Sequence, residues 1–518
     1  MNDPSRAGQR ALRTLLVLGA ACATAVAGTV PAGAAARAAL TVEASRSSVT
    51  FYRTVYHDEN GEEETYMEGD LGIYAVADVK QKFEVRVTRK DYETPVVARL
   101  IRKGKDRTLP TPADFTGLTD FSRTTYKDSS GKVVSSEVKP YCPNAYQPVR
   151  RNPKAPASSP FPQGCGGNPY TLGAVWGLQA GYAASLTGDE GYYYGSGEVP
   201  DLKPGRYVVT TSILPAWREV LRIPASKAEA TVTVTVEQRD EDECGGGDCL
   251  RNARARTAAQ RTAATRTAAA PKSLTGKKVK PSGPLPDLRA LPAWGISADG
   301  HYLNFGATVW NGGPGRLVVD GFRDTKNADL MHAYQYFFTA GGKQKGYAPV
   351  GGMEWDARDT HQHWHFKDFA RYRLVAADKK TLVVDSGKEA FCLANTDMVD
   401  YTVKGANWKP ENTDLSTACG DREALGVREV LDPGSGDTYT QYREGQAFDL
   451  TGVPNGTYYI QIAANPDKVL YERSRKNNVS LRKVVIGGSK DARTVAVGKV
   501  GIVDEPPVEG PGEEELHR

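Results

Sequence analysis

One stretch of this 518-residue chain cannot contribute to a folded core, and it divides the sequence in two. Between Cys249 and Pro286 there is no acidic residue, and Thr-Ala-Ala repeats are interspersed with nine basic side chains. The stretch has almost no large apolar residue, so it cannot bury enough surface to offset the entropy lost on ordering. We therefore expect a basic low-complexity linker, with its preceding cysteine loop, at residues 241–283, and a folded domain on each side.

Both flanking regions carry the pattern of half-buried β-strands. Residues 83–87 and 232–236 alternate apolar and polar side chains, which is typical of strands with one face in a core. Turns containing Pro and Gly lead into apolar runs at residues 202–209 and 453–462. The sequence predicts an all-β protein with two β-sandwich-like domains, at residues 38–240 and 284–487, and a disordered acidic tail at residues 488–518.

The N-terminus has the features of an export signal. Arg6, Arg10 and Arg13 precede an apolar run from Leu15 to Val26, and small residues near position 34 form cleavage sites. This pattern predicts a secretory signal peptide at residues 1–36. No later stretch reaches the ~20 apolar residues of a membrane span. We expect a secreted protein without a membrane span, and the net charge of +4 gives no indication of nucleic-acid binding.

Export changes how the cysteines are interpreted. Removal of the signal peptide leaves six cysteines, and an even number in an exported protein suggests disulfide bonds. Six cysteines allow fifteen pairings, but these six lie in three well-separated sequence pairs. The most economical pairing is Cys142–Cys165, Cys244–Cys249 and Cys392–Cys419.

The segment His361-Gln362-His363-Trp364-His365 concentrates three of the seven histidines of the chain. On a β-strand this spacing puts all three imidazoles on one face and Trp364 on the other. Imidazole is a common ligand of copper, zinc and iron. At ~3.3 Å per residue, His361 and His365 start ~13 Å apart, so one ion could bind all three only where the strand curves or bulges. The alternative is a polar strand face, or two ligands and a bystander.

The histidine segment is one of four segments that occur in a familiar order. Glu354-Trp355 precedes the histidines, and the others are Gly387-Lys388-Glu389-Ala390-Phe391-Cys392-Leu393, Asp437-Thr438-Tyr439, and Asp449-Leu450-Thr451-Gly452-Val453 with Asn465-Pro466, Glu472 and Asn477-Asn478. Together they resemble the catalytic domain of the lysyl oxidase family, over roughly 200 residues from Leu285 onward. The resemblance is to a bacterial secreted member of that family. The sequence departs from animal members, which carry many more cysteines in this domain than the two found here.

The resemblance implies a copper ion bound by His361, His363 and His365. It also implies a lysine tyrosylquinone, a self-derived cofactor formed when Lys388 adds to the oxidised ring of Tyr439. A lysine can add only as a neutral amine, and its ordinary pKa of ~10.4 falls on burial or beside a positive charge.

The implied reaction is the oxidation of a primary amine or peptidyl-lysine to an aldehyde, with O2 as acceptor and release of H2O2 and ammonia. The quinone forms a covalent adduct with the amine, and a base removes the neighbouring proton. Asp368 and Asp437 are the candidates for that base.

Two other functions fit the same residues. The chain could be a secreted two-domain binding protein with a structural metal and no quinone. It could also be an oxygenase or hydrolase with one metal on three histidines. The basic segment at residues 251–280 could contact an anionic cell wall, but we favour a solvated spacer.

The linker hypothesis makes a prediction for limited digestion. Trypsin should cut the mature chain first between residues 251 and 280, because nine basic residues stand in a segment with little to bury. From the sequence we expect a stable fragment, from about residue 280 onward, that keeps amine oxidase activity. First cuts inside either predicted β domain, mapped by mass spectrometry, would show that the boundaries are misplaced.

Overall fold

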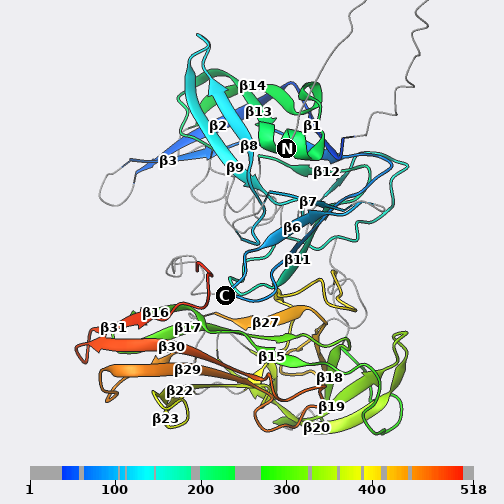
Figure 1. The fold of residues 1–518 in the computed structure, drawn as a ribbon, viewed down its shortest axis with the longest axis vertical. Coiled ribbons are helices and arrows are strands. Elements are labelled where there is room, and N and C mark those ends of the chain that lie inside the picture. Colours follow the sequence, from blue (N-terminus) through cyan, green and yellow to red (C-terminus); the bar gives the residue numbers. More distant parts are fainter. Residues whose placement is uncertain are drawn as a thin grey trace, which may run out of the picture. The chain divides into compact units, whose positions relative to one another are not determined.

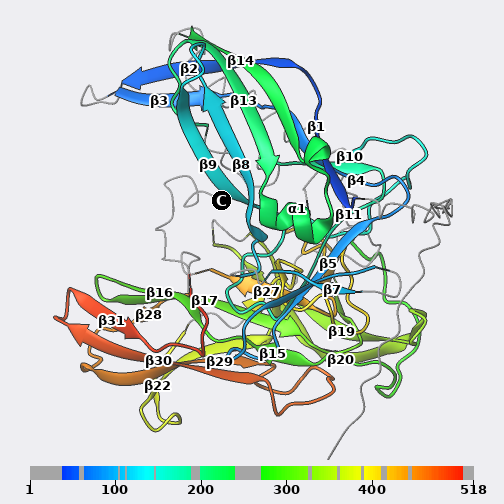
Figure 2. The ribbon, with the colours of Figure 1, turned by 45° about the horizontal axis from the view of Figure 1, so that its top comes forward.

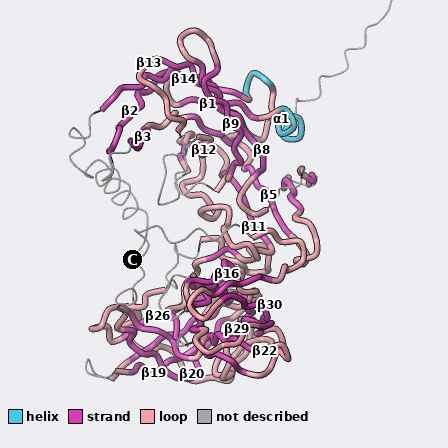
Figure 3. The backbone as a smooth tube through the Cα atoms, turned by 90° about the vertical axis from the view of Figure 1, so that its left-hand side faces the viewer, coloured by secondary structure: helices cyan, strands magenta, loops and turns pink. Residues whose placement is uncertain are grey.

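The structure is a computed structural model in which most regular elements are strands (Figure 3). It describes residues 38–57, 63–102, 106–110, 114–144, 148–187, 199–239, 270–324, 329–358, 362–386, 390–409, 417–440 and 446–505. The predicted signal peptide, the Cys244–Cys249 pair and most of the predicted linker lie outside these residues. The prediction of a mostly β protein is confirmed.

The first region, residues 38–239, contains three sheets (Figure 1). One has the order β1 (Leu40–Ala44), β4 (Ile73–Ala77), β12 (Tyr182–Ser185), β10 (Val149–Arg150). The second has the order β11 (Gly173–Leu178), β5 (Phe83–Thr88), β6 (Val97–Leu100), β7 (Arg107–Thr108). The third has the order β3 (Glu63–Glu68), β2 (Ser48–His57), β14 (Glu229–Arg239), β13 (Gly205–Ile213), β8 (Leu118–Lys127), β9 (Val133–Tyr141). The α-helix α1 (Pro215–Leu221) and the 3-10 turn η1 (Ala225–Lys227) lie between β13 and β14 (Figure 2).

The second region, residues 270–505, also contains three sheets. One has the order β15 (Leu288–Ala290), β17 (Tyr302–Asn311), β27 (Ser435–Tyr439), β25 (Asp397–Met398), and β17 also pairs with β16 (Trp294–Asp299) and β28 (Phe448–Asp449). Another has the order β24 (Ala390–Phe391), β21 (His363–Lys367), β20 (Gln344–Asp356), β19 (Leu330–Phe338), β18 (Leu317–Phe322), β26 (Gly426–Leu431). The last has the order β23 (Leu382–Asp385), β22 (Ala370–Ala376), β29 (Gly456–Ala464), β30 (Val479–Gly488), β31 (Arg493–Val497).

The alternating segments of the sequence form strands where they were predicted. Residues 83–87 lie in β5, residues 232–236 lie in β14, and the two Pro-Gly turns lead into β13 and β29. Their apolar residues face inward: Val85, Val234 and Ile460 are fully buried. Burial of one such side chain contributes about 1.5–3 kcal/mol, so the alternation itself fixes which face of each strand meets the core.

The C-terminal segment departs from the predicted disordered tail. Residues 493–497 instead form β31, which pairs antiparallel with β30 from Val484↔Val497 to Gly488↔Arg493. Val503 is buried farther along the chain. This strand is hard to predict from the sequence because it has only five residues, Arg493-Thr494-Val495-Ala496-Val497. It also lies at the edge of a sheet, where a strand needs little burial of its own.

Two disulfides agree with the predicted pairing. Cys142 bonds to Cys165 in the first region, and Cys392 bonds to Cys419 in the second, with Cα atoms 5.7 and 6.1 Å apart. Both separations fall in the ordinary range for a disulfide. No helix in the part of the chain that the structure describes is long and apolar enough to cross a bilayer.

The second disulfide should stabilise the sheet that contains β21. Replacing Cys392 and Cys419 together by Ser should lower the free energy of opening of β21 by about 3 kcal/mol, because the bond closes a loop of 27 residues. Hydrogen–deuterium exchange of β21 peptides measures that change. The matched control replaces Cys142 and Cys165, which should leave exchange in β21 unchanged. Equal exchange in the wild type and the Cys392/Cys419 variant would contradict the prediction.

Candidate functional site

His363 and His365 lie on a strand, as their spacing predicted. In the antiparallel pair of β20 and β21, His363 stands opposite Asp356, and His365 stands opposite Glu354. Side chains of opposite residues share a face of the sheet. Trp364 points the other way, is fully buried, and donates its indole N–H to the backbone oxygen of Asp421 at 3.0 Å. Its predicted place in the core is confirmed.

His363 and His365 come close enough to share one ion. Their ring centroids are 4.6 Å apart and their planes meet at 71°. Two imidazoles that each bind one metal at about 2 Å have centroids within roughly 6 Å of each other, so this pair fits. The regular strand begins at His363, after Gln362, whose φ of +41° is rare for a residue other than glycine. His361 lies outside the described residues.

A buried carboxylate orients His365. The Nδ1 atom of His365 lies 3.2 Å from Oδ2 of Asp356, and His365 is fully buried. Burial opposes ionisation of Asp356, but hydrogen bonds from Arg358 and the charges of Arg358 and His365 hold its pKa below the ordinary value. A metal-binding histidine commonly donates its second ring N–H to such a carboxylate. Two imidazoles beside a carboxylate are donor types that copper accepts, so the residues present fit copper.

Among the residues that the structure describes, no group of three or more His, Cys, Asp and Glu side chains is arranged to hold a metal ion. Because His361 is not among them, the predicted triad is not tested by this finding. The metal set of His361, His363 and His365 therefore stays a prediction, supported by the geometry of two of its members.

Tyr439 is held at the end of β27. The hydroxyl of Tyr439 accepts a hydrogen bond from the backbone N–H of Cys392 at 3.1 Å. The ring meets that of Phe391 edge to face, with centroids 4.9 Å apart. Lys388 precedes Cys392 by four residues and lies outside the described residues.

The surroundings of Tyr439 oppose loss of its proton. Burial, followed by the negative charges of Asp437 and Glu429, raises the pKa of Tyr439 well above its ordinary value. Tyr372 adds to the effect. A cation at the site would act in the opposite direction, because a nearby positive charge favours the phenolate.

Two buried carboxylates converge beside Tyr439. Asp437 precedes it by two residues on β27 and accepts the backbone N–H of Ala394 at 3.4 Å. Glu429 on β26 accepts the backbone N–H of Leu393 at 3.1 Å, and burial raises its pKa well above the ordinary value. Of the two base candidates from the sequence, the structure brings Asp437 to the tyrosine. Asp368 instead lies in the turn after β21, 4.0 Å from Arg371.

Sequence reasoning missed Glu429 and Asp356. Glu429 occupies a core-facing position between Val427 and Leu431, which are both fully buried. A carboxylate at a core position of a strand was the signal that could have identified it. Asp356 could have been identified only from the register of β20 and β21, because nothing in its local sequence marks it.

The disulfide Cys392–Cys419 ties the two parts of this site together. Cys392 contacts the hydroxyl of Tyr439 through its backbone, and the backbone oxygen of Cys419 accepts the N–H of Trp364 at 3.2 Å. Trp364 stands between His363 and His365 in the sequence. One covalent bond therefore links the segment that holds the tyrosine to the strand that carries the histidines.

Part of the chain matches a known protein family. Residues 338–494 match the model of the lysyl oxidase family. The predicted resemblance to lysyl oxidases is confirmed for this part of the chain. The matched segment includes all five predicted site residues, namely His361, His363, His365, Lys388 and Tyr439.

Individual lysyl oxidases match over a shorter stretch. A protein-lysine 6-oxidase of Sus scrofa is 30% identical over 126 residues, which is 24% of this chain and 44% of that protein. The protein-lysine 6-oxidase of Homo sapiens is 30% identical over 126 residues, or 26% of its length. The human lysyl oxidase homolog 1 is 31% identical over 126 residues, or 19% of its length. The chain thus spans less than half of these relatives, and the bacterial origin stays a prediction.

The metal site makes a prediction that does not depend on turnover. Replacing His363 or His365 by Ala should lower bound copper by an order of magnitude or more, because each removes one ligand. Asp356→Asn should cost 10–100-fold in copper affinity, because it removes the carboxylate that faces Nδ1 of His365. Metal analysis after dialysis measures both effects.

The matched control is His332→Ala, because the side chain of His332 is mostly exposed on β19. This variant should keep its copper. Full copper occupancy in the His363→Ala protein would refute the assignment of the site.

Proposed function

We propose that the chain is a secreted, copper-dependent amine oxidase of the protein-lysine 6-oxidase type. It oxidises a primary amine or a peptidyl-lysine to an aldehyde with O2, and releases H2O2 and ammonia. The observation that carries the proposal is the position of the Tyr439 hydroxyl against Cys392, inside a segment that matches lysyl oxidases. Lys388 is four residues from that contact in the sequence.

Copper and a lysine tyrosylquinone would supply the oxidation of the tyrosine ring and the acceptance of electrons from the amine. His361, His363 and His365 would hold the metal, with Asp356 fixing the ring of His365. Lys388 and Tyr439 would form the quinone. These assignments follow the resemblance to lysyl oxidases and fit the donor atoms described above.

The residues around Tyr439 have distinct roles in this proposal. The backbone N–H of Cys392 fixes the direction of the phenol oxygen, and the edge of the Phe391 ring limits rotation of the tyrosine. Asp437 stands close enough to influence the pKa of Tyr439, so it is the candidate for the base that takes the proton next to the amine. Glu429, whose raised pKa favours the neutral acid, limits the negative charge at the site.

The proposal predicts a covalent bond between Lys388 and Tyr439 in active protein. Mass spectrometry of digested, copper-loaded protein should find the two peptides joined. Lys388→Arg should keep copper but lose the cross-link and the activity, because a guanidinium stays protonated and cannot add to the ring. Tyr439→Phe should behave the same way, because it lacks the hydroxyl with which oxidation begins.

Two matched controls accompany these variants. Lys343→Arg, in the turn between β19 and β20, and Tyr302→Phe, at an exposed position of β17, should leave the cross-link intact. Full amine oxidase activity in protein whose two peptides are recovered unlinked would overturn the mechanism. A protein that binds copper but oxidises no amine and contains no cross-link would instead favour a binding protein with a structural metal.

A further inference from the structure

A segment of the first region adds to the sheet that carries Tyr439. The backbone N–H groups of Leu172 and Gly173 donate to the oxygen of Val399, at 2.7 and 3.1 Å, directly after β25. The N–H of Tyr401 donates back to the oxygen of Gly173 at 2.8 Å. Gly173 also forms a parallel bridge with Asp400. The chain after β25 is thus paired on one side with the first region, while β25 itself pairs with β27.

Asn168 reaches into this sheet from the first region. The side-chain amide of Asn168 donates to Oγ1 of Thr308 at 3.0 Å and to Oδ2 of Asp397 at 3.4 Å. Its carbonyl oxygen accepts the backbone N–H of Tyr170 at 3.0 Å, which fixes the orientation of the amide. Asn168 is only 4% exposed. Both N–H contacts are therefore made in a site where a lost hydrogen bond is costly.

The same polar cluster holds the residue before Tyr439. The hydroxyl of Thr438 donates to Asp397 and lies 2.7 Å from the hydroxyl of Thr308. The backbone N–H of Thr438 donates to Oγ1 of Thr396 at 2.8 Å. Asn168 and Thr438 thus share two partners, Asp397 and Thr308. A shift of Thr438 would move Tyr439 directly, because the two are neighbours on β27.

A second contact fixes the segment that carries Asn168. Tyr170 is fully buried, and its hydroxyl donates to Oε1 of Glu505 at 2.7 Å, where Arg482 also binds. The backbone N–H of Ile502 donates to the oxygen of Tyr92 at 2.9 Å, and Val503 packs in the same apolar cluster as Tyr170. The chain after β31 therefore anchors the first region to the lysyl oxidase-like region.

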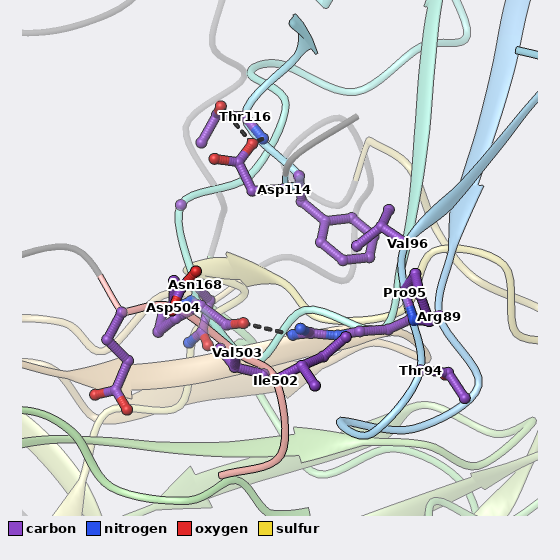
Figure 4. A pocket seen from close by; sticks show the side chains of 14 residues that line it. Arg89, Thr94, Pro95, Val96, Asp114, Thr116, Asn168, Ile502, Val503 and Asp504 are labelled. Carbon is purple, nitrogen blue, oxygen red and sulfur yellow. Dashed lines mark hydrogen bonds between the residues drawn. The ribbon is translucent and has the colours of Figure 1, made fainter. Parts of the chain in front are cut away.

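A pocket of about 600 Å³ lies next to this contact, with Asn168 in its wall (Figure 4). Arg89 lines the same pocket and donates to the backbone oxygen of Pro169, the residue after Asn168. The Asn168 segment is therefore held on the pocket side as well as on the sheet side.

We propose that Asn168 is a positioning residue for Tyr439, and that the first region completes the amine oxidase site by fixing β27. The proposal rests on the function proposed above. It assigns the first region a role in forming the cofactor, because Tyr439 must be held in one place while Lys388 adds to its ring. It also changes the expectation for the fragment that begins near residue 280, which should form little quinone without Asn168.

The test uses the full mature chain loaded with copper in air. Asn168→Ala removes both N–H donors. Hydrogen–deuterium exchange of the peptide covering residues 435–439 should become about tenfold faster. A tenfold change corresponds to about 1.4 kcal/mol, which is the contribution of one buried hydrogen bond. Quinone per bound copper, measured by the absorbance of the phenylhydrazine adduct, should fall severalfold. The KM for amine, measured on the chains that have formed quinone, should stay unchanged.

Two further variants separate positioning from general loss of stability. Val234→Ala removes buried apolar volume in β14 of the first region, so it should lower the melting temperature but leave quinone per copper unchanged. Thr438→Val removes the hydroxyl at the other end of the cluster and should reproduce the Asn168→Ala effect. In the double variant, quinone per copper should fall by less than the sum of the two single decreases, because both substitutions act through Asp397 and Thr308.

The outcomes distinguish this proposal from the proposed function. Unchanged exchange at residues 435–439 in Asn168→Ala overturns the positioning role, whatever the activity. Unchanged quinone per copper in that variant overturns the role in cofactor formation. A wild-type protein without quinone refutes the proposed function, and the exchange measurement alone then decides whether Asn168 holds β27.

Discussion

The Cys392–Cys419 disulfide is the constraint on which the candidate site depends. Each half-cystine contacts a different part of the site through its backbone. The N–H of Cys392 donates to the hydroxyl of Tyr439. The oxygen of Cys419 accepts the backbone N–H of Trp364, which stands between His363 and His365. The strand next to Cys392, β24, has only two residues, and Cys419 does not lie in a named strand. Regular hydrogen bonding alone would hold them weakly, and the covalent bond limits how far they can separate.

Electrostatics at the site favour a cation. Asp437 lies beside Tyr439, and its negative charge raises the pKa of the tyrosine together with burial. Asp356 plays a related part beside His365, where it orients the ring. A buried carboxylate beside Tyr439 and another beside His365 disfavour the anionic phenolate, and a bound cation would act in the opposite direction.

The sequence predicted what depends on local pattern. The alternation of apolar and polar residues predicted β5 and β14. The export signal and the spacing of the cysteines predicted the disulfides Cys142–Cys165 and Cys392–Cys419. The alternation of side chains along a strand predicted that Trp364 points away from the histidines. The sequence could not predict what depends on register between distant strands, such as Asp356 next to His365 or Asn168 next to Asp397. Asn168 and Asp397 are 229 residues apart, and nothing near either one in the sequence identifies its partner.

In the proposed function, the chain oxidises primary amines through a carbonyl cofactor made from its own side chains. The most direct measurement is peroxide release by the copper-loaded mature protein against a panel of primary amines, with and without phenylhydrazine. We expect peroxide and aldehyde in equal amounts with at least one amine, and loss of both after phenylhydrazine treatment. Amine turnover that phenylhydrazine leaves unchanged would contradict it.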